Sequence, residues 1–402
     1  MKYLYIRIIT AVCLFAISMM TLLTFQEHVM FYQEQHTLFL YTWQYFEHML
    51  KVKGLSDYLA AFVIQFYHIP ALGAAIVSAL LVAVYLLTES IIRRLTGRRD
   101  LFQTGVAAAI ALYFTLDSIN ETPATLMTTL MILTGIWIAV LISGRWLPAR
   151  KQDTKLPLWK VVLPLALASV YFISGYGWLT GNYDRRERTM ILMNKAVVNH
   201  DWDEAIERAD HYLSAGNSNR LVLYLRNLSL AYKGELLEHL FDYPIPFGMD
   251  ALVFPWTGQG IDTEFGHYVR EAVGGINGAH CWAFEAMTIW GKTAPHVTNL
   301  ARYNIALGRP LVAQKFVNIL ANTLFYRDEA DRLQRQINGE EPADLHYAFA
   351  NIEEPTTRFL DMTFATDDFR EIVRADSTNE MARQYLAALT RTSAPPMKSI
   401  KQ

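Results

Sequence analysis

Cysteine is scarce in this chain of 402 residues, which contains only Cys13 and Cys281. Cys13 lies inside an apolar run, so we expect no intrachain disulfide and a fold that rests on packing. Only 18% of the residues are charged, the net charge is −2, and no basic patch interleaved with aromatic residues occurs. Nucleic acid is therefore not an expected partner. No motif specifies a reaction, a cofactor or a metal site, so we expect no cofactor and no metal.

Long apolar runs are concentrated in the first 180 residues, and the rest of the chain has none. Each run approaches the roughly 20 residues that a helix needs to cross about 30 Å of hydrocarbon. The sequence therefore predicts a polytopic transmembrane bundle over residues 1–183, in an all-α protein. Glu89, near the end of the second run, is expected to need no buried partner. The runs are residues 6–25, 70–92, 101–119, 122–143 and 159–179.

The first run resembles a signal peptide in its basic start, but residues 24–27 lack the small-residue cleavage pattern, so we interpret it as an uncleaved anchor. Basic residues then concentrate between runs two and three and between runs four and five, whereas residues 117–123 have none. Lys and Arg favour the cytoplasmic side. Five crossings from a cytoplasmic N-terminus place the C-terminal domain outside, although Arg185, Arg186 and Arg188 oppose this orientation.

The loop between the first two runs, residues 26–69, is long and rich in aromatic residues. Tyr and Trp favour the level of the lipid headgroups. We expect two interfacial helices along the membrane, over Thr37–Leu50 and Ser56–Phe66, separated at Gly54.

The same loop concentrates carboxylates and imidazoles, which together can bind a divalent cation or act as acid and base. No spacing matches a zinc signature. The interpretation that we favour is that these residues form the wet side of interfacial helices; a catalytic or metal role is the alternative. They are Glu27, His28, Glu34, His36, Glu47, His48, Asp57 and His68.

A first membrane helix followed by a long exported loop with membrane-parallel helices and acidic residues resembles the opening of C-type glycosyltransferases, which use lipid-linked sugars. The resemblance implies that an acidic residue of the loop acts as base or metal ligand. Glu27 and Glu34 are the counterparts by position, with His28 and His36 beside them. The loop has no Asp-Asp or Glu-Asp pair, and those enzymes have more crossings.

Residues 184–392 read as successive helices without strand alternation. Met193–Ile206 resembles a tetratricopeptide repeat, in which Asp201 starts a helix and Ala205 and Ala209 give the small crossing face. Such an array commonly binds proteins on its concave surface. The alternative is an unrelated helical bundle.

A second place of this type is Asn299–Pro310, where Gly308 allows the turn and Pro310 begins a helix with Ala313 at its crossing. Another helix is expected from Asn379, before a flexible tail over residues 393–402.

The segment 241–262 is too rich in Pro and Gly to be regular helix. We expect it to be ordered and to pack across the helices, either as an aromatic plug or as a binding site. Trp256 is the first candidate for partner binding, because Trp is enriched at binding hot spots. The full set of candidates is Trp256, Phe247, Tyr243 and Phe254.

Residues 26–70, 227–236 and 302–309 resemble an uncharacterised family of Bacteroidota inner-membrane proteins that carry a tetratricopeptide-like C-terminal half. The resemblance implies a Gram-negative inner (plasma) membrane and a periplasmic domain, without an activity. We therefore expect a periplasmic protein-protein interaction scaffold that contacts the bilayer and a protein partner of the cell envelope. The alternative is a glycosyltransferase-like enzyme, or a relic of one, that acts on a lipid-linked sugar.

Overall fold

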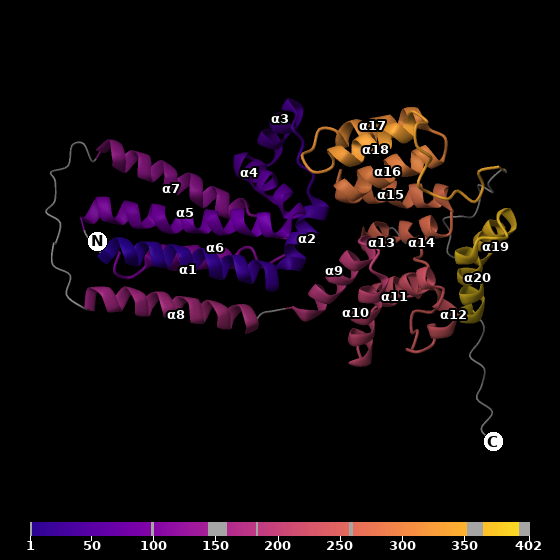
Figure 1. The fold of residues 1–402 in the computed structure, drawn as a ribbon, viewed down its shortest axis with the longest axis horizontal. Helices are drawn as coiled ribbons and strands as arrows, with labels where there is room; N and C mark the ends of the chain where they lie inside the picture. The colour runs from indigo at the N-terminus through magenta and orange to yellow at the C-terminus, as the bar shows by residue number, and fades with distance from the viewer. Residues whose placement is uncertain are drawn as a thin grey trace, which may run out of the picture. The chain divides into compact units, whose positions relative to one another are not determined.

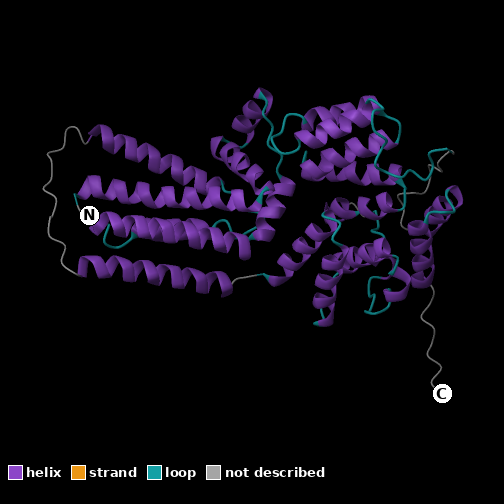
Figure 2. Ribbon diagram, viewed as in Figure 1, coloured by secondary structure: helices purple, strands orange, loops and turns teal. Residues whose placement is uncertain are grey.

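The computed structural model describes residues 2–97, 100–143, 159–181, 184–256, 260–351 and 365–393. Within these ranges every regular element is a helix, as the all-α prediction required (Figures 1 and 2). The chain divides into two compact units, residues 1–184 and 185–402. The expected tail and most of the basic loop before residue 159 lie outside the described residues.

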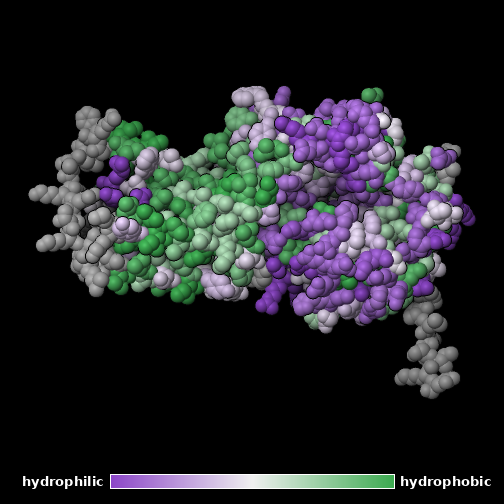
Figure 3. Space-filling model, viewed as in Figure 1, coloured by the Kyte–Doolittle hydropathy of each residue, from purple (hydrophilic) through white to green (hydrophobic). Residues whose placement is uncertain are grey.

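Four helices of the first unit are long and apolar enough to cross a membrane, which agrees with four of the five expected runs. Their surface is predominantly apolar on the face shown in Figure 3. They are α1 (Lys2–Thr24), α5 (Pro70–Thr96), α7 (Ala124–Ser143) and α8 (Trp159–Gly181).

The third run forms only a short helix, α6 (Thr104–Phe114), so the expectation of a helix over residues 101–119 is wrong in extent. The helix begins at Thr104 and not at residue 101. Asp100 caps this start, because its Oδ2 accepts hydrogen bonds from Thr104 Oγ1 at 2.8 Å and from Gly105 N at 3.1 Å. Gln103, with φ 53°, is in the left-handed region just before the helix. Eleven residues rise about 16 Å at 1.5 Å each, roughly half of a hydrocarbon layer.

The chain nevertheless crosses the bundle between α5 and α7, because these two helices run in the same direction. Near their starts, Met30 of α2 (Glu27–His36) contacts Gly73 of α5, and Gln33 donates to the Glu121 carbonyl just before α7. Near their ends, Trp137 Nε1 donates to Ser90 Oγ at 3.0 Å. Residues 100–123 therefore return from one end to the other, with α6 on the way (Figure 1).

Glu89 has a charged partner, contrary to the expectation from its place near the end of a run. Its side chain is only 2% exposed, and its Oε2 lies 3.2 Å from Arg7 Nε of α1. A carboxylate removed from water needs an opposite charge. Away from this pair, apolar residues of α1, α5 and α6 pack together in one buried core. Among them are Leu14, Val77, Leu81, Val106 and Ala109.

The loop between α1 and α5 is helical. After α2 come α3 (Trp43–Val52), α4 (Leu55–Ile64) and the short 3-10 helix η1 (Gln65–His68). Two helices separated at Gly54, where φ is 123°, occur as expected, but the first begins at Trp43 and not at Thr37, and α2 was not predicted. α4 packs on α5 and α7, and α3 packs on α4.

The second unit begins with three helices that pack on one another and form its first stack. They are α9 (Arg185–Val198), α10 (Trp202–Ser214) and α11 (Arg220–Lys233). Asp201 Oδ1 accepts from Glu204 N at 3.1 Å, and Ala205 and Ala209 are fully buried, as the sequence predicted. On the face shown in Figure 3 this unit is mostly hydrophilic.

A second stack contains the turn at Gly308 (φ 68°), the helix start at Pro310 and the buried Ala313, all as predicted. Between the stacks lie α12 (Leu236–His239), the 3-10 helix η2 (Gly248–Ala251) and α13 (Gly260–Phe265). The second stack comprises α14 (His267–Ala272), α15 (Ile276–Trp290), α16 (Ala294–Ala306), α17 (Pro310–Leu320) and α18 (Arg327–Ile337).

The last two helices, α19 (Ala365–Ala375) and α20 (Glu380–Ser393), do not extend that stack. α20 packs instead on α11, α12 and η2, and Gln384 Nε2 donates to the Ala231 carbonyl at 3.4 Å. Phe369 and Tyr385 are fully buried in the core of the first stack. Repeats of an open array contact only their neighbours, so this closure departs from a simple stack.

Candidate functional site

The loop after α1 contains a buried carboxylate beside an imidazole. Glu34, near the end of α2, is 5% exposed, and its Oε1 lies 3.1 Å from Nδ1 of His68 at the end of η1. Gln35 Nε2 donates to the other carboxylate oxygen at 2.6 Å. This pair has the composition of an acid-base site, in which a carboxylate and an imidazole lie within hydrogen-bond distance of each other.

The other three candidates of this loop also belong to α2. Glu27 is half-buried in the first turn of the helix, and His28 is 4% exposed. His36 stacks on the ring of Tyr32, with ring centroids 3.9 Å apart, and its Nδ1 lies 2.8 Å from the Tyr32 carbonyl oxygen. In the part of the chain that the structure describes, no group of three or more His, Cys, Asp or Glu is arranged to hold a metal ion.

The Pro- and Gly-rich segment of the second unit, which the structure describes over residues 241–256, packs across helices through its aromatic side chains. Phe254 is 3% exposed and stacks on Tyr224 of α11, with centroids 4.1 Å apart. Tyr243 is half-buried beneath the guanidinium of Arg226. Asn227 Nδ2 donates to the Ala251 carbonyl at 2.9 Å. The segment is therefore held by the core at several points.

Two of its four candidate aromatics face outward. Phe247 is 37% exposed and Trp256 is 38% exposed. The Trp256 ring meets the buried Trp282 of α15 edge-on, with centroids 4.6 Å apart. An exposed indole fixed against a buried one is suited to contact a ligand with little loss of side-chain entropy.

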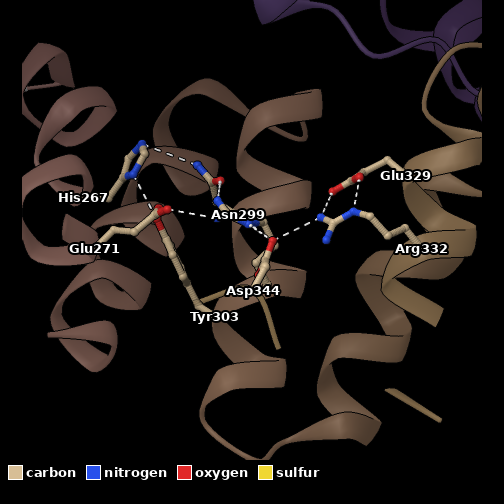
Figure 4. A network of polar contacts seen from close by, with 8 residues as sticks. His267, Glu271, Asn299, Tyr303, Glu329, Arg332 and Asp344 are labelled. Carbon is tan, nitrogen blue, oxygen red and sulfur yellow. Dashed lines mark hydrogen bonds and ion pairs between the residues drawn. The ribbon is translucent and has the colours of Figure 1, made fainter. Parts of the chain in front are cut away.

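A polar network that the sequence analysis missed links α14, α16 and α18 (Figure 4). Its inner end is a chain of hydrogen bonds: Tyr303 Oη donates to Glu271 Oε2 at 2.5 Å and lies 3.0 Å from His267 Nδ1. Asn299 Nδ2 lies 3.5 Å from the other ring nitrogen, His267 Nε2. Because the Tyr303 hydrogen goes to the carboxylate, Nδ1 of the imidazole is the donor to Oη.

Charged pairs continue the network towards the surface. Arg302 bridges two carboxylates, with Nη2 3.0 Å from Glu271 Oε1 and Nε 3.1 Å from Asp344 Oδ2. Arg332 shares Asp344 at 3.2 Å and also pairs with Glu329. The network thus fixes the chain around Asp344, after α18, to the helices of the second stack. The sequence did hold a signal, since His267 and Glu271, like Asn299 and Tyr303, are four residues apart on one helix.

Burial sets the protonation of this network. Desolvation, with the nearby charges of His296 and Arg302, lowers the pKa of His267 to about 3. Desolvation and the Glu271 carboxylate raise the pKa of Tyr303 well above its usual value. At neutral pH the imidazole of His267 and the phenol of Tyr303 are both neutral. Each of these two groups therefore keeps a fixed role as hydrogen-bond donor or acceptor in the network.

A family model matches the chain over residues 2–180 and 106–390. The chain belongs to DUF6057, a family of unknown function. The two matches together span both units, so the membrane helices and the C-terminal helices are parts of one DUF6057 architecture. No curated protein and no solved structure matched the chain. The sites in this DUF6057 chain therefore have to be judged on their own geometry.

Protonation of His267 should destabilise the second unit. The folded-state pKa lies below the unfolded value of about 6.5, so the stabilisation is complete above that pH and is lost as the pH falls towards 3. We expect His267→Gln to reduce the slope of unfolding free energy against pH by up to about 1.4 kcal/mol per pH unit between pH 6 and 4. Denaturant unfolding at several pH values measures this slope, and equal slopes in the two proteins would contradict the assignment.

Proposed function

We propose that the chain is a multi-pass inner-membrane protein whose tetratricopeptide-like second unit binds a protein partner in the periplasm. Three observations support this function. Four helices are suited to cross a membrane, the second unit is a mostly hydrophilic stack of helices, and the exposed indole of Trp256 is held against Trp282. The last observation gives the proposal its main support, because it provides a preformed contact point.

The orientation follows from charge and from the path of the chain. The N-terminal turns of α1 and the end of α5 lie together through the Arg7–Glu89 pair, and Arg93 and Arg94 follow in α5. Basic residues favour the cytoplasmic side. The return of the chain through α6 gives a third crossing, so α8 ends on the opposite, periplasmic side from the start of α1.

Reporter fusions test this topology. A periplasm-active phosphatase fused after Gln402 should be active, and the same enzyme fused after Ser143, at the end of α7, should be inactive. A cytoplasm-active fluorescent reporter should give the reverse pattern. Equal behaviour of the two fusion sites would contradict a membrane crossing by α8, and an inactive phosphatase after Gln402 would contradict a periplasmic second unit.

Replacement of Trp256 by Ala should weaken partner binding by roughly 2 kcal/mol, or about thirtyfold in affinity, because the exposed ring is the anchor. Its partner would first be identified by crosslinking in membranes. Phe241→Ala is the matched control, since this ring belongs to the same segment and is 59% exposed. Binding that survives Trp256→Ala, or a lower melting temperature that explains its loss, would make the segment structural only.

A second function, from a different class, is supported by the buried Glu34 beside His68. We propose as the alternative that the membrane unit is a glycosyltransferase-like enzyme acting on a lipid-linked sugar, with Glu34 as base. A carboxylate that is 5% exposed beside an imidazole is suited to take up a proton from a hydroxyl group. In this alternative Glu27 has no assigned step.

Glu34→Gln keeps the shape and removes the base, so the enzymatic alternative predicts a loss of roughly a hundredfold or more in the activity that complements a deletion strain. Glu47→Gln, at an exposed carboxylate of the same loop, is the control. The membrane abundance of each variant would be measured in parallel. Full complementation by Glu34→Gln would exclude Glu34 as a catalytic residue and leave the scaffold.

A further inference from the structure

Helix α3 carries an apolar stripe that its own unit covers only in part, where the Phe46 ring meets Tyr58 of α4 with centroids 5.0 Å apart. Trp43, Phe46 and Leu50 follow one another at positions i, i+3 and i+7, so they lie along one side of the helix. Trp43 is 71% exposed and Leu50 is 40% exposed. The rings of Trp43 and Phe46 contact each other, with centroids 5.3 Å apart, which makes the stripe continuous.

The remaining sides of α3 have different chemistry. Tyr45 and Met49 turn inward and pack in a small core with Phe39 and Ala61. The side of α3 that adjoins the stripe beyond Trp43 is polar and exposed, and on it Lys51 Nζ donates to Glu47 Oε1 at 2.6 Å. An amphipathic helix with one face packed, one face polar and one flank of Trp, Phe and Leu is typical of a helix that lies at a membrane surface.

The position of α3 in its unit agrees with such a surface. In Figure 1, α3 lies crosswise to the long axes of α5 and α7, at the end of the bundle where these helices begin. It is fixed there because α3 packs on α4, and α4 packs on α7. α7 is a candidate membrane span that exposes large apolar side chains such as Ile132 and Ile136. Helix α3 therefore lies at the end of helices that are suited to cross a membrane.

We propose that α3 inserts Trp43, Phe46 and Leu50 into the headgroup boundary of the lipid leaflet at this end of the bundle. The occupant of the stripe is the bilayer, because a crosswise helix at the end of a candidate membrane span meets the leaflet boundary. Indole rings favour that level of the membrane. The inserted helix sets the depth of the bundle in the leaflet and holds the α2–α4 loop, with Glu34, against the membrane. This site is independent of the protein partner proposed for the second unit.

Site-directed labelling of the full-length chain tests the proposal. Cys13 and Cys281 are replaced by Ser, and single cysteines are introduced as W43C and L50C in the stripe and as E47C and K51C in the polar side. All four positions are exposed, so the label should not disturb the packing. Each variant carries an environment-sensitive fluorophore and is reconstituted in phosphatidylcholine–phosphatidylglycerol vesicles at a low protein-to-lipid ratio.

Labels at 43 and 50 should be quenched by spin-labelled lipids at a depth of roughly 5 to 10 Å, with blue-shifted emission, whereas labels at 47 and 51 should be quenched by aqueous iodide. Equal iodide quenching at all four positions would overturn the proposal. Protection of 43 and 50 that disappears when the protein is diluted in lipid would assign the stripe to a second copy of the chain. Protection that requires an added membrane extract would assign it to another protein, and either result would also overturn the proposal.

Discussion

Hydrocarbon offers no hydrogen bonds to a backbone, and this constraint governs the first unit. The four long helices satisfy it internally, but residues 100–123 cross the bundle with only eleven residues in helix. Their remaining polar groups need partners from the protein. Gln26 Nε2 donates to Asp117 Oδ1 at 3.1 Å, and Gln33 Nε2 donates to the Glu121 carbonyl at 2.8 Å. Gln26, just before α2, and Gln33, within it, thus supply hydrogen-bond partners to the non-helical residues that follow the short α6.

The second unit depends on burial of a different kind. Helices α9–α11, residues of α13–α15 and the last two helices share one apolar core, in which Tyr385 and Phe369 are fully buried. The second stack adds the polar network of His267, Glu271 and Tyr303, whose members are neutral or paired. Losing one partner of such a network leaves a buried group unsatisfied, at a cost of about 1–3 kcal/mol. The network therefore specifies how α14, α16 and α18 meet more strictly than apolar contacts alone would.

The sequence predicted what short-range chemistry controls. Asp201, Gly308 and Pro310 act within four residues, so a cap, a left-handed turn and a helix start could all be located. The short α6 could not, because apolar composition does not report the cap at Asp100. Contacts across the fold were also out of reach: Glu34 and His68 are 34 residues apart, and Gln384 reaches Ala231 across 153 residues. Such pairs depend on which helix faces pack together, and periodicity leaves that open.

An anchor alone explains little of the membrane unit, since one crossing is enough to hold a soluble module at a bilayer. Ionisable groups inside such a unit are costly and mark function more often than support. Here Glu89 is buried against Arg7 within the helices, and Glu34 is buried against His68 where the loop covers their end. A purely passive anchor would gain stability from apolar residues at both places. The two buried carboxylates therefore argue for a task of the first unit beyond attachment, and Glu34, beside the imidazole of His68 at the end of the helices, is the better placed of the two to perform it.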